Sequence, residues 1–371
     1  MRMRTIVNVT IAAALTGATH GFPVTVAAPQ EPSGAVYTMT NAASGNSVLV
    51  FEGAARGRLK PAGEFSTGGL GTGGGLGSQG AIALTSNQRF LLVVNAGSND
   101  ITSFLVNADG LEVADRVSSG GRQPISVAVD RNLVYVLNAG GSVGESDNIT
   151  GFRLGSDGRL SPIPQSTRPL SAPSTGPAQV AFSPDGAHLV VTEKSASALA
   201  VYSVTKDGLA TGPQAFPSSG TTPFRFSFGK HDLLVVSEAA ASTVSSYSLA
   251  SGSPEVVTAS IPTMQTAACW LTVTDDGRFA YTANAGSGSI TGYSITFEGS
   301  LTPLDSDGRT AVTGTGSHPT DLALSGNGRF LFQLSAGANR IDGFRVGTDG
   351  SLTTVSSVSG IPSTAAGLVS R

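Results

Sequence analysis

Short runs of alternating apolar and polar residues, separated by turn-forming dipeptides, extend along most of the chain. Residues 266–304 show the pattern clearly, with such runs at Leu271–Val273, Phe279–Ala283, Ile290–Ile295 and Leu301–Leu304. Asp-Gly, Gly-Ser and Glu-Gly turns lie between the runs. A period of two residues bounded by these turns is typical of antiparallel strands joined by hairpins. This segment is therefore predicted to form a four-stranded antiparallel sheet.

The same four-run unit recurs along the chain. The second run of each unit ends at a polar or small residue, and successive ends lie 43 to 55 residues apart. These ends are Asn41, Asn95, Asn138, Glu193, Glu238, Asn284 and Ser335. A period of about 40–50 residues is typical of four-stranded propeller blades. The fold class is therefore predicted to be all-β, a seven-bladed β-propeller of four-stranded antiparallel blades spanning residues 34–371.

The first unit begins directly at its second run, near Val36, and lacks the opening run of the other units. The C-terminal stretch from Ile361 to Val369 resembles that opening run and has no second run after it. We therefore predict that the C-terminal strand closes the first blade. This closure would join the ends of the ring and remove two free sheet edges.

Three longer insertions interrupt the repeat and are predicted to be surface loops. They are Ser66–Ser78, Gly140–Asp147 and Ser166–Gly176. The first is rich in glycine, which predicts a flexible loop. It contains no GK[ST] sequence and no helix is expected after it, so it does not match a phosphate-binding loop.

The amino-acid composition limits the kinds of molecule that the protein is expected to bind. The chain has 48 Gly, 19 Pro and a formal net charge of −3. No basic stripe is interleaved with aromatic residues, so nucleic acid is not an expected partner. The Asp-Gly turns lack the dense acidic spacing of calcium loops. We expect a monomer with no cofactor and no metal ion, whose partner is a small molecule or glycan at the channel mouth.

The single cysteine, Cys269, excludes an intramolecular disulfide. It lies between Ala268 and Trp270 at the start of a predicted strand. A catalytic thiol needs an activating charge nearby, and no histidine is close in sequence. Cys269 is therefore expected to be a small buried apolar residue.

The N-terminus has the pattern of a signal peptide. Arg2 and Arg4 precede the mostly apolar run Ile6–Ala18, and Ala27 and Ala28 are small residues suited to cleavage. The run is shorter than the about 18–20 residues of a membrane-spanning helix. Residues 1–28 are thus predicted to be a signal peptide, and the mature protein to be secreted or periplasmic without a membrane span.

Propeller topology predicts where a site would lie. The first strand of each blade lines the central channel, and its start lies on the same face as the end of the second strand. Candidates at the starts of first strands are Gln123, Gln179, Arg225, Trp270, His318 and Asp321. Candidates at the ends of second strands are Asn95, Asn138, Glu193, Glu238 and Asn284. These residues are predicted to surround one opening.

Four of these candidates suit catalysis. Glu193 and Glu238 hold equivalent places in adjacent blades, and two carboxylates at one mouth suit an acid/base pair or a cation. Arg225 suits contact with an anion. His318 is the only histidine at the start of a first strand. Two structural alternatives remain: the glutamates accept hydrogen bonds in tight loops, as Asn does there, and the lone histidine is simply solvated.

The chain resembles the lactonase-like seven-bladed β-propellers, which include bacterial 6-phosphogluconolactonase and the fungal carboxymuconate lactonising enzyme. The resemblance covers roughly residues 34–370, in units such as PAQVAFSPDGAHLVVTEK and SHPTDLALSGNGRFLF. TEK at 192–194, SEA at 237–239 and AACW at 267–270 are similar to exported members of unassigned activity. The resemblance implies a propeller fold and lactone chemistry carried by His, Arg and Glu at the channel mouth.

The chain departs from the family pattern at two motifs. Members typically carry His-x-His after the proline that opens the fourth blade, where this chain has Ala178, Gln179 and Val180. They typically carry Pro-Arg-His at the next blade, where Phe224 and Arg225 follow the proline in this chain. The family's glutamate at the end of the second strand is matched by Glu238.

Two functions remain open from the sequence. In the first, Glu238 or Glu193 activates water against a lactone or other cyclic ester, and Arg225 stabilises the developing oxyanion. In the second, the propeller is not an enzyme and binds an envelope glycan, peptide or protein at its mouth. The missing histidines favour binding, whereas the paired glutamates and Arg225 favour hydrolysis.

Overall fold

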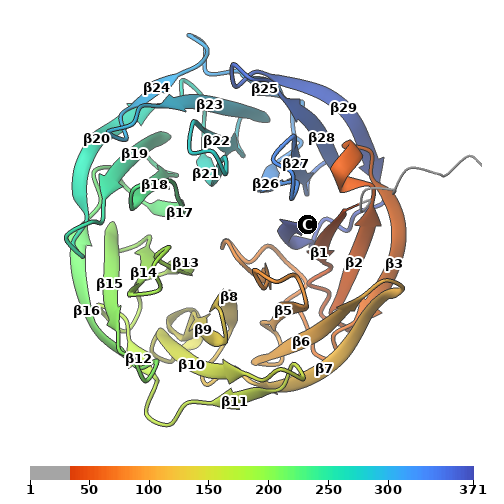
Figure 1. The fold of residues 1–371 in the computed structure, drawn as a ribbon, viewed down its shortest axis with the longest axis vertical. Coiled ribbons are helices and arrows are strands. Elements are labelled where there is room, and N and C mark those ends of the chain that lie inside the picture. The colour runs from red at the N-terminus through yellow and green to blue at the C-terminus, as the bar shows by residue number, and fades with distance from the viewer. Residues whose placement is uncertain (1–33) are drawn as a thin grey trace, which may run out of the picture. The chain divides into compact units, whose positions relative to one another are not determined.

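The computed structural model describes residues 34–371, so the predicted signal peptide lies outside the described residues. The described chain forms seven antiparallel sheets arranged in a ring around a central axis (Figure 1). Five sheets have four strands, and two have five because the outer strand is broken into two short pieces. The predicted seven-bladed propeller is therefore confirmed.

The first three blades follow the predicted repeat. From the inner to the outer edge, the first blade contains β30 (Ala366–Ser370), β1 (Ala35–Met39), β2 (Ser47–Glu52) and β3 (Lys60–Ser66). In the same direction, the second contains β4 (Ile82–Leu84), β5 (Phe90–Asn95), β6 (Asp100–Asn107) and β7 (Gly110–Ser118). The third contains β8 (Pro124–Asp130), β9 (Leu133–Asn138), β10 (Asn148–Leu154), β11 (Leu160–Pro162) and β12 (Arg168–Pro169).

The other four blades have the same order. The fourth contains β13 (Pro177–Phe182), β14 (His188–Glu193), β15 (Ala198–Val204) and β16 (Ala210–Pro217). The fifth contains β17 (Pro223–Phe228), β18 (Leu233–Glu238), β19 (Thr243–Ser248) and β20 (Glu255–Pro262). The sixth contains β21 (Ala268–Val273), β22 (Phe279–Asn284), β23 (Ser289–Ile295), β24 (Leu301–Pro303) and β25 (Ala311–Val312). The seventh contains β26 (Pro319–Leu324), β27 (Phe330–Ser335), β28 (Arg340–Val346) and β29 (Leu352–Ser359).

Two short 3₁₀ turns lie in the connections between strands: η1 (Ala54–Arg56) between β2 and β3, and η2 (Gly140–Val143) between β9 and β10. No helix among residues 34–371 has the length and apolar character needed to cross a membrane.

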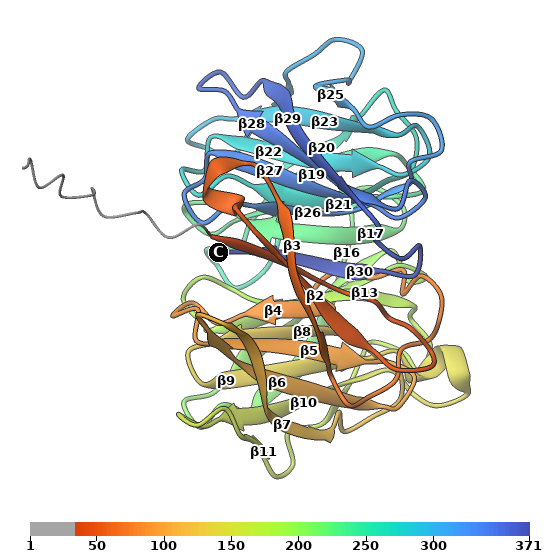
Figure 2. The ribbon, with the colours of Figure 1, turned by 90° about the vertical axis from the view of Figure 1, so that its right-hand side faces the viewer.

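The C-terminal strand closes the ring as predicted. Strand β30 pairs antiparallel with β1, with Val369 opposite Tyr37. Figure 2 shows the ring from its edge, with dark blue β30 beside the red and orange strands of the first blade. The backbone of Arg371 also exchanges two hydrogen bonds with Ala35, at 2.9 and 3.2 Å. One blade thus joins the two ends of the described chain.

The hydrophobic core lies between the facing sheets of adjacent blades. The second strands are buried along nearly their whole length, as in β5, β9 and β22. In six of the seven blades, the third strand carries a fully buried aromatic residue. These are Phe104, Phe152, Tyr202, Tyr247, Tyr293 and Phe344. Apolar residues of adjacent sheets pack together in shared clusters, so each blade needs its neighbours to bury both faces.

The inner strands form a closed ring in which each contacts the next: β4, β8, β13, β17, β21, β26 and β30. In β8, β13, β17, β21 and β26 the pairing with the second strand shifts near the first residues, which is the geometry of a β-bulge. The third residues of these strands are Ser126, Gln179, Arg225, Trp270 and Asp321. We call these five residues the channel layer. A bulge re-aims the side chain that follows it, so one repeated irregularity positions the whole layer.

The glycine-rich insertion Ser66–Ser78 differs from the predicted flexible surface loop. It runs from the first blade into the centre of the ring, where Figure 1 shows it in orange. Its middle is exposed, but Ser78 and Gln79 are only 7% and 4% exposed. The glycine-rich composition of this insertion predicts a flexible loop. Backbone hydrogen bonds of this segment with loops of the first two blades, and bonds from Lys194 and Trp270 to its last carbonyl groups, override that tendency.

Candidate functional site

The channel layer contains one buried ion pair. Arg225 Nη1 lies 3.1 Å from Asp321 Oδ1, and the two side chains are 13% and 0% exposed. Arg225 lies on β17 and Asp321 on β26, with β21 between them around the ring. Two side chains from non-adjacent inner strands meet only by reaching across the channel. The structure thus brings together two of the residues that the sequence singled out.

Burial dominates the electrostatics of this pair. It raises the pKa of Asp321, and the nearby Arg225 charge and the hydrogen bond from Gln79 only partly oppose that rise. Burial likewise lowers the pKa of Arg225, against the opposing effect of Asp321. Both ions are held in a poorly solvated site, where charges interact strongly and perturbed pKa values are typical of functional groups.

Three polar atoms of the pair and of the adjoining Gln79 find no hydrogen-bond partner within residues 34–371. They are Asp321 Oδ2, Arg225 Nε and Gln79 Oε1. Buried polar atoms are nearly always satisfied in folded proteins, because each unsatisfied one costs about 1–3 kcal/mol. Three such atoms in one cluster therefore indicate a place where a water molecule or a ligand binds.

The glycine-rich segment covers this pair. Gln79 Nε2 donates to Asp321 Oδ1 at 2.7 Å. Trp270 Nε1 donates to the carbonyl of Ser78 at 3.0 Å, and Lys194 Nζ donates to the carbonyl of Gly77 at 2.6 Å. The backbone N–H of Gln79 also donates to the carbonyl of Ala178 at 3.0 Å. Residues 77–79 therefore contact four strands or loops from different parts of the channel wall.

The aromatic ring of Phe224 packs against two of these donors, Trp270 and Lys194. Trp270 packs edge-on against Phe224, with ring centroids 5.0 Å apart. Lys194 Nζ lies 5.2 Å from the centre of the Phe224 ring, a favourable position for a cation. Burial lowers the pKa of Lys194. Cys269 packs behind this group and is buried as expected, which raises the pKa of its thiol to about 12.

Glu238 is fully buried at the end of β18 and its carboxylate is surrounded by donors. It accepts hydrogen bonds from the Gly220 amide at 2.7 Å and from the hydroxyl of Ser245 at 2.7 Å. Further hydroxyl donors are Ser218, Thr243 and Ser260. These contacts hold the loop that leads into β17. They correspond to the structural alternative weighed for this residue, and its catalytic role stays a prediction.

Glu193 occupies the equivalent place at the end of β14 and is also fully buried. It accepts hydrogen bonds from the amide of Ser171, at 3.0 Å, and from the Ser171 hydroxyl. Burial raises its pKa, and the bonds from Ser171 partly oppose that rise. Glu193 and Glu238 thus each hold the loop preceding their own blade, and within residues 34–371 no hydrogen bond links them to Arg225.

The asparagines at second-strand ends act in the same way. Asn95 Nδ2 donates to the residues five and seven positions later, Asp100 and Thr102. Asn284 does the same with Ser289 and Thr291. Asn138 Nδ2 donates to the carbonyl of Ser119 and to Asn148. Glu238 follows this spacing with Thr243 and Ser245, so one loop-anchoring position recurs around the ring.

The other predicted residues lie apart from the ion pair. Gln179 is bonded through both amide atoms to the backbone of Phe226 and joins two blades. Gln123 accepts a hydrogen bond from Ser142 at 2.6 Å. His318 is exposed, with a backbone φ of 42° just before Pro319. The structure therefore brings Trp270, Arg225 and Asp321 to one site and leaves Gln123, Gln179 and His318 outside it.

Lys194 and Gln79 belong to the site but were not among the predicted residues. Lys194 directly follows Glu193 in the TEK sequence, which was the available signal. Gln79 lies just beyond the insertion, and a single sequence does not indicate that this segment turns into the channel.

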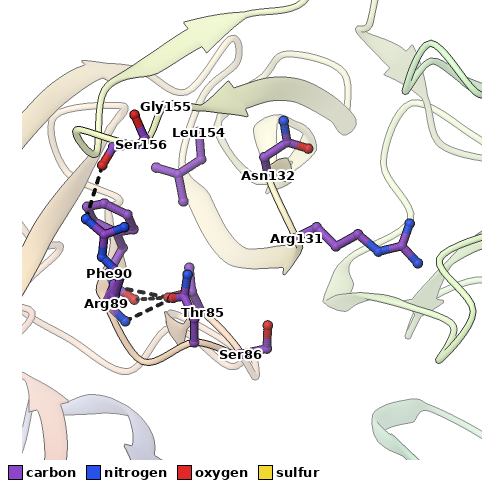
Figure 3. A pocket seen from close by; sticks show the side chains of 10 residues that line it. Thr85, Ser86, Arg89, Phe90, Arg131, Asn132, Leu154, Gly155 and Ser156 are labelled. Carbon is purple, nitrogen blue, oxygen red and sulfur yellow. Dashed lines mark hydrogen bonds between the residues drawn. The ribbon is translucent and has the colours of Figure 1, made fainter.

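The described hollows lie on the opposite face, among turns that join first to second strands. One of about 420 Å³ lies between the second and third blades (Figure 3). There Arg89 lies 5.3 Å from the ring centre of Phe90 and donates to the carbonyl of Ser156 at 3.3 Å. Arg278 and Phe279 repeat this contact at a second hollow of about 280 Å³. Such repeated hollows are a consequence of blade packing rather than one distinctive site.

Fold and site together define a seven-bladed propeller with a buried ion pair in its channel. The chain matches the family described as "Lactonase, 7-bladed beta-propeller" over residues 33–173, 146–265 and 255–366. These matches cover most of the chain, which therefore belongs to this lactonase family.

Solved structures show the same fold. A putative 6-phosphogluconolactonase from Bacteroides fragilis is 17% identical, with a TM-score of 0.71 over 91% of this chain and 98% of that chain. The periplasmic gluconolactonase of Pseudomonas aeruginosa is 20% identical, with a TM-score of 0.70 over 90% and 98%. A putative 6-phosphogluconolactonase from Bacteroides uniformis is 20% identical, with a TM-score of 0.73 over 90% and 99%. No curated protein matches.

Proposed function

We propose that this protein hydrolyses a lactone inside its central channel, with Asp321 as the general base and Arg225 as the oxyanion partner. The observation that carries the proposal is the buried Arg225–Asp321 pair, in which carboxylate Oδ2 and guanidinium Nε have no partner within residues 34–371. A base and a fixed cation in one poorly solvated site are the two groups that ester hydrolysis needs. Membership of the lactonase family supports the same chemistry.

The proposed reaction uses one water molecule. Asp321 removes a proton from the water as its oxygen forms a bond to the lactone carbonyl carbon. Arg225 stabilises the negative charge that develops on the carbonyl oxygen. The ring C–O bond then breaks, and the proton held by Asp321 passes to the leaving alkoxide. The product is an open-chain hydroxy acid, and the carboxylate and guanidinium return to their starting states.

Turnover of a panel of lactones by the mature protein tests this proposal. Burial raises the pKa of Asp321 to about 6, so kcat/KM is expected to rise with pH through about 6 and then level off. Because the folded-state pKa exceeds its ordinary value, the same group contributes stability that is lost as pH rises through about 6. A uniform absence of hydrolysis above the buffer rate would contradict the proposal.

Non-enzymatic binding of an envelope glycan, peptide or protein is the second candidate. It is favoured by two observations: His318 is exposed, and the carboxylates of Glu193 and Glu238 are already occupied by hydrogen bonds from the protein. Saturable ligand binding without turnover of any lactone would support this candidate instead.

The protein is further proposed to act outside the cytoplasm. Arg2, Arg4 and the apolar run Ile6–Ala18 support export through a cleaved signal peptide. Mass spectrometry of the protein recovered outside the cytoplasm is expected to show an N-terminus between about residues 22 and 30. Recovery of the chain in the cytoplasm with Met1 intact would argue against export.

A further inference from the structure

We propose that Lys194, Trp270, Arg225 and Asp321 form a binding site for a hydroxy carboxylate, and that residues 77–79 occupy it as an internal mimic of that ligand. The inference rests on the proposed function in one respect, because the Arg225–Asp321 pair that it includes is the proposed reaction centre. It goes further by assigning the ligand class and two additional binding residues.

Two donors of the channel are directed at backbone oxygens that a ligand can replace. Lys194 Nζ lies 2.6 Å from the carbonyl oxygen of Gly77, and Trp270 Nε1 lies 3.0 Å from that of Ser78. The donors come from the end of β14 and from β21, in different blades. Neither contact belongs to a strand pairing. Two carbonyl oxygens on consecutive residues thus stand in for the oxygen atoms of a ligand.

The ion pair completes the site from the other side. Gln79 Nε2 donates to Asp321 Oδ1 at 2.7 Å, in the position that a ligand hydroxyl would take. Asp321 Oδ2 and Arg225 Nε find no partner within the described chain. The segment therefore satisfies the site only in part. A ligand with more oxygen atoms, including one that reaches Arg225, would satisfy it better.

The charges of the site indicate which class of ligand it binds. The site presents two cationic side chains, Lys194 and Arg225, and one carboxylate, Asp321. One negative charge on the ligand therefore balances it. The donors Lys194 and Trp270 require acceptor oxygens, while Asp321 favours a hydroxyl donor. A carboxylate with several hydroxyl groups has this combination, and it is the kind of product that lactone hydrolysis releases.

The mimic is held in place from the first blade. Asn41 Nδ2 donates to Thr72 Oγ1 at 2.9 Å, and Asn41 Oδ1 accepts from the Thr72 amide at 3.0 Å. Close packing explains the glycine there, since a Cβ on Gly71 would lie 2.1 Å from the Asn41 carbonyl carbon. Residues 73–75 beyond this anchor are exposed glycines. The fixed base and the exposed glycines allow residues 77–79 to leave the channel while the first blade stays folded, once the bonds from the Ser78 hydroxyl to the Ile125 carbonyl and from the Gln79 backbone amide to the Ala178 carbonyl are broken.

Tryptophan fluorescence provides a direct test, because Trp270 is the only tryptophan of the chain. Titration of the mature protein with D-gluconate is expected to change its emission saturably, as Ser78 leaves the indole and the ligand replaces it. Sorbitol has the hydroxyl groups without the charge, and acetate has the charge without the hydroxyl groups. Both are expected to bind at least about tenfold more weakly, as expected for the loss of one charged hydrogen bond.

Three variants sharpen the test. Lys194→Ala removes a donor and is expected to weaken gluconate binding about tenfold or more. Asn41→Ala loosens the anchor of the mimic, so it is expected to tighten binding about fivefold or more by favouring the open channel. Asn327→Ala is the matched control, because Asn327 holds a turn on the opposite face through Ser325 and Arg329. It is expected to leave the titration unchanged.

The outcomes separate this inference from the proposed function. Lactone turnover without any emission change on gluconate addition would overturn the mimic while leaving hydrolysis intact. Gluconate binding without turnover would support the site and argue against hydrolysis. Tightening by Asn327→Ala equal to that by Asn41→Ala would show a general loosening of the fold, and it would overturn the inference.

Discussion

Replacing Asp321 with Asn is expected to lower kcat/KM for lactone hydrolysis by about 100- to 10,000-fold, because an amide does not accept the proton of the attacking water. The substitution also leaves Arg225 without a counter-charge where its side chain is only 13% exposed. Loss of one partner of a buried pair costs about 3–5 kcal/mol of stability. Steady-state turnover and thermal melting should therefore be measured on the same preparation.

A double variant separates catalysis from folding. Arg225→Gln combined with Asp321→Asn removes both charges, and neutral replacement of a whole buried pair is often tolerated. It is expected to melt at a higher temperature than Asp321→Asn alone and to remain inactive. Wild-type turnover by this double variant would exclude Asp321 as the base.

Glu238→Gln provides the comparison with the carboxylates predicted from the sequence. The Glu238 carboxylate accepts hydrogen bonds from at least two donors at 2.7 Å, Gly220 and Ser245. An amide directs its NH₂ group toward one of these donors, which costs about 1.5–3 kcal/mol. The expected result is a lower melting temperature with kcat/KM close to wild type. A large loss of turnover at unchanged stability would instead place catalysis at Glu238.

The fold was predictable because its signals are local and repeated. Period-two runs between Asp-Gly turns specify strands within about ten residues of sequence. Seven repeats then specify blades, because no single sheet buries both of its faces. Even the closure by β30 was predictable, since residues 361–369 have the pattern of an opening run. The aromatic residues of the third strands agree with this packing.

The site was predictable only in part, for a physical reason. Topology predicted Arg225, Trp270 and Asp321 at the channel, and in the structure they lie on the inner strands β17, β21 and β26. It did not indicate which of them touch, since Arg225 and Asp321 lie two blades apart. Such contacts depend on side-chain reach across the ring. Sequence spacing carries no information on that reach.

Composition misled the interpretation of the glycine-rich insertion. Glycine raises the entropy of a free loop, which predicts flexibility. Glycine also permits close approach between this segment and the loop after β5, because a Cβ on Gly97 would lie 2.1 Å from the Gly71 carbonyl oxygen. The segment is packed against the neighbouring loop for that reason. Glycine thus suits both a flexible loop and a tightly packed one. Which of the two forms depends on the residues that pack against the loop.

Removal of residues 361–371 is expected to destabilise the whole propeller. It deletes β30 and leaves β1 with an unpaired inner edge, while β26 and β4 lose their neighbour in the ring. Ile361 and Leu368 are each 2% exposed, and burial of such side chains contributes about 1.5–3 kcal/mol each. With the lost strand pairing, the expected loss is about 5 kcal/mol or more, a large part of the usual 5–15 kcal/mol.

A rearranged chain distinguishes the strand's contacts from mere chain length. Arg371 and Ala35 exchange backbone hydrogen bonds, so a short turn is able to connect residue 371 to residue 34. Residues 361–371 placed before residue 34 through such a turn should restore most of the melting temperature, because β30 then pairs with β1 as a hairpin. Thr353→Ala on the exposed face of β29 is the surface control and should change stability by less than about 0.5 kcal/mol. Melting of the truncated chain at the temperature of the full chain would mean that the ring does not depend on closure by β30.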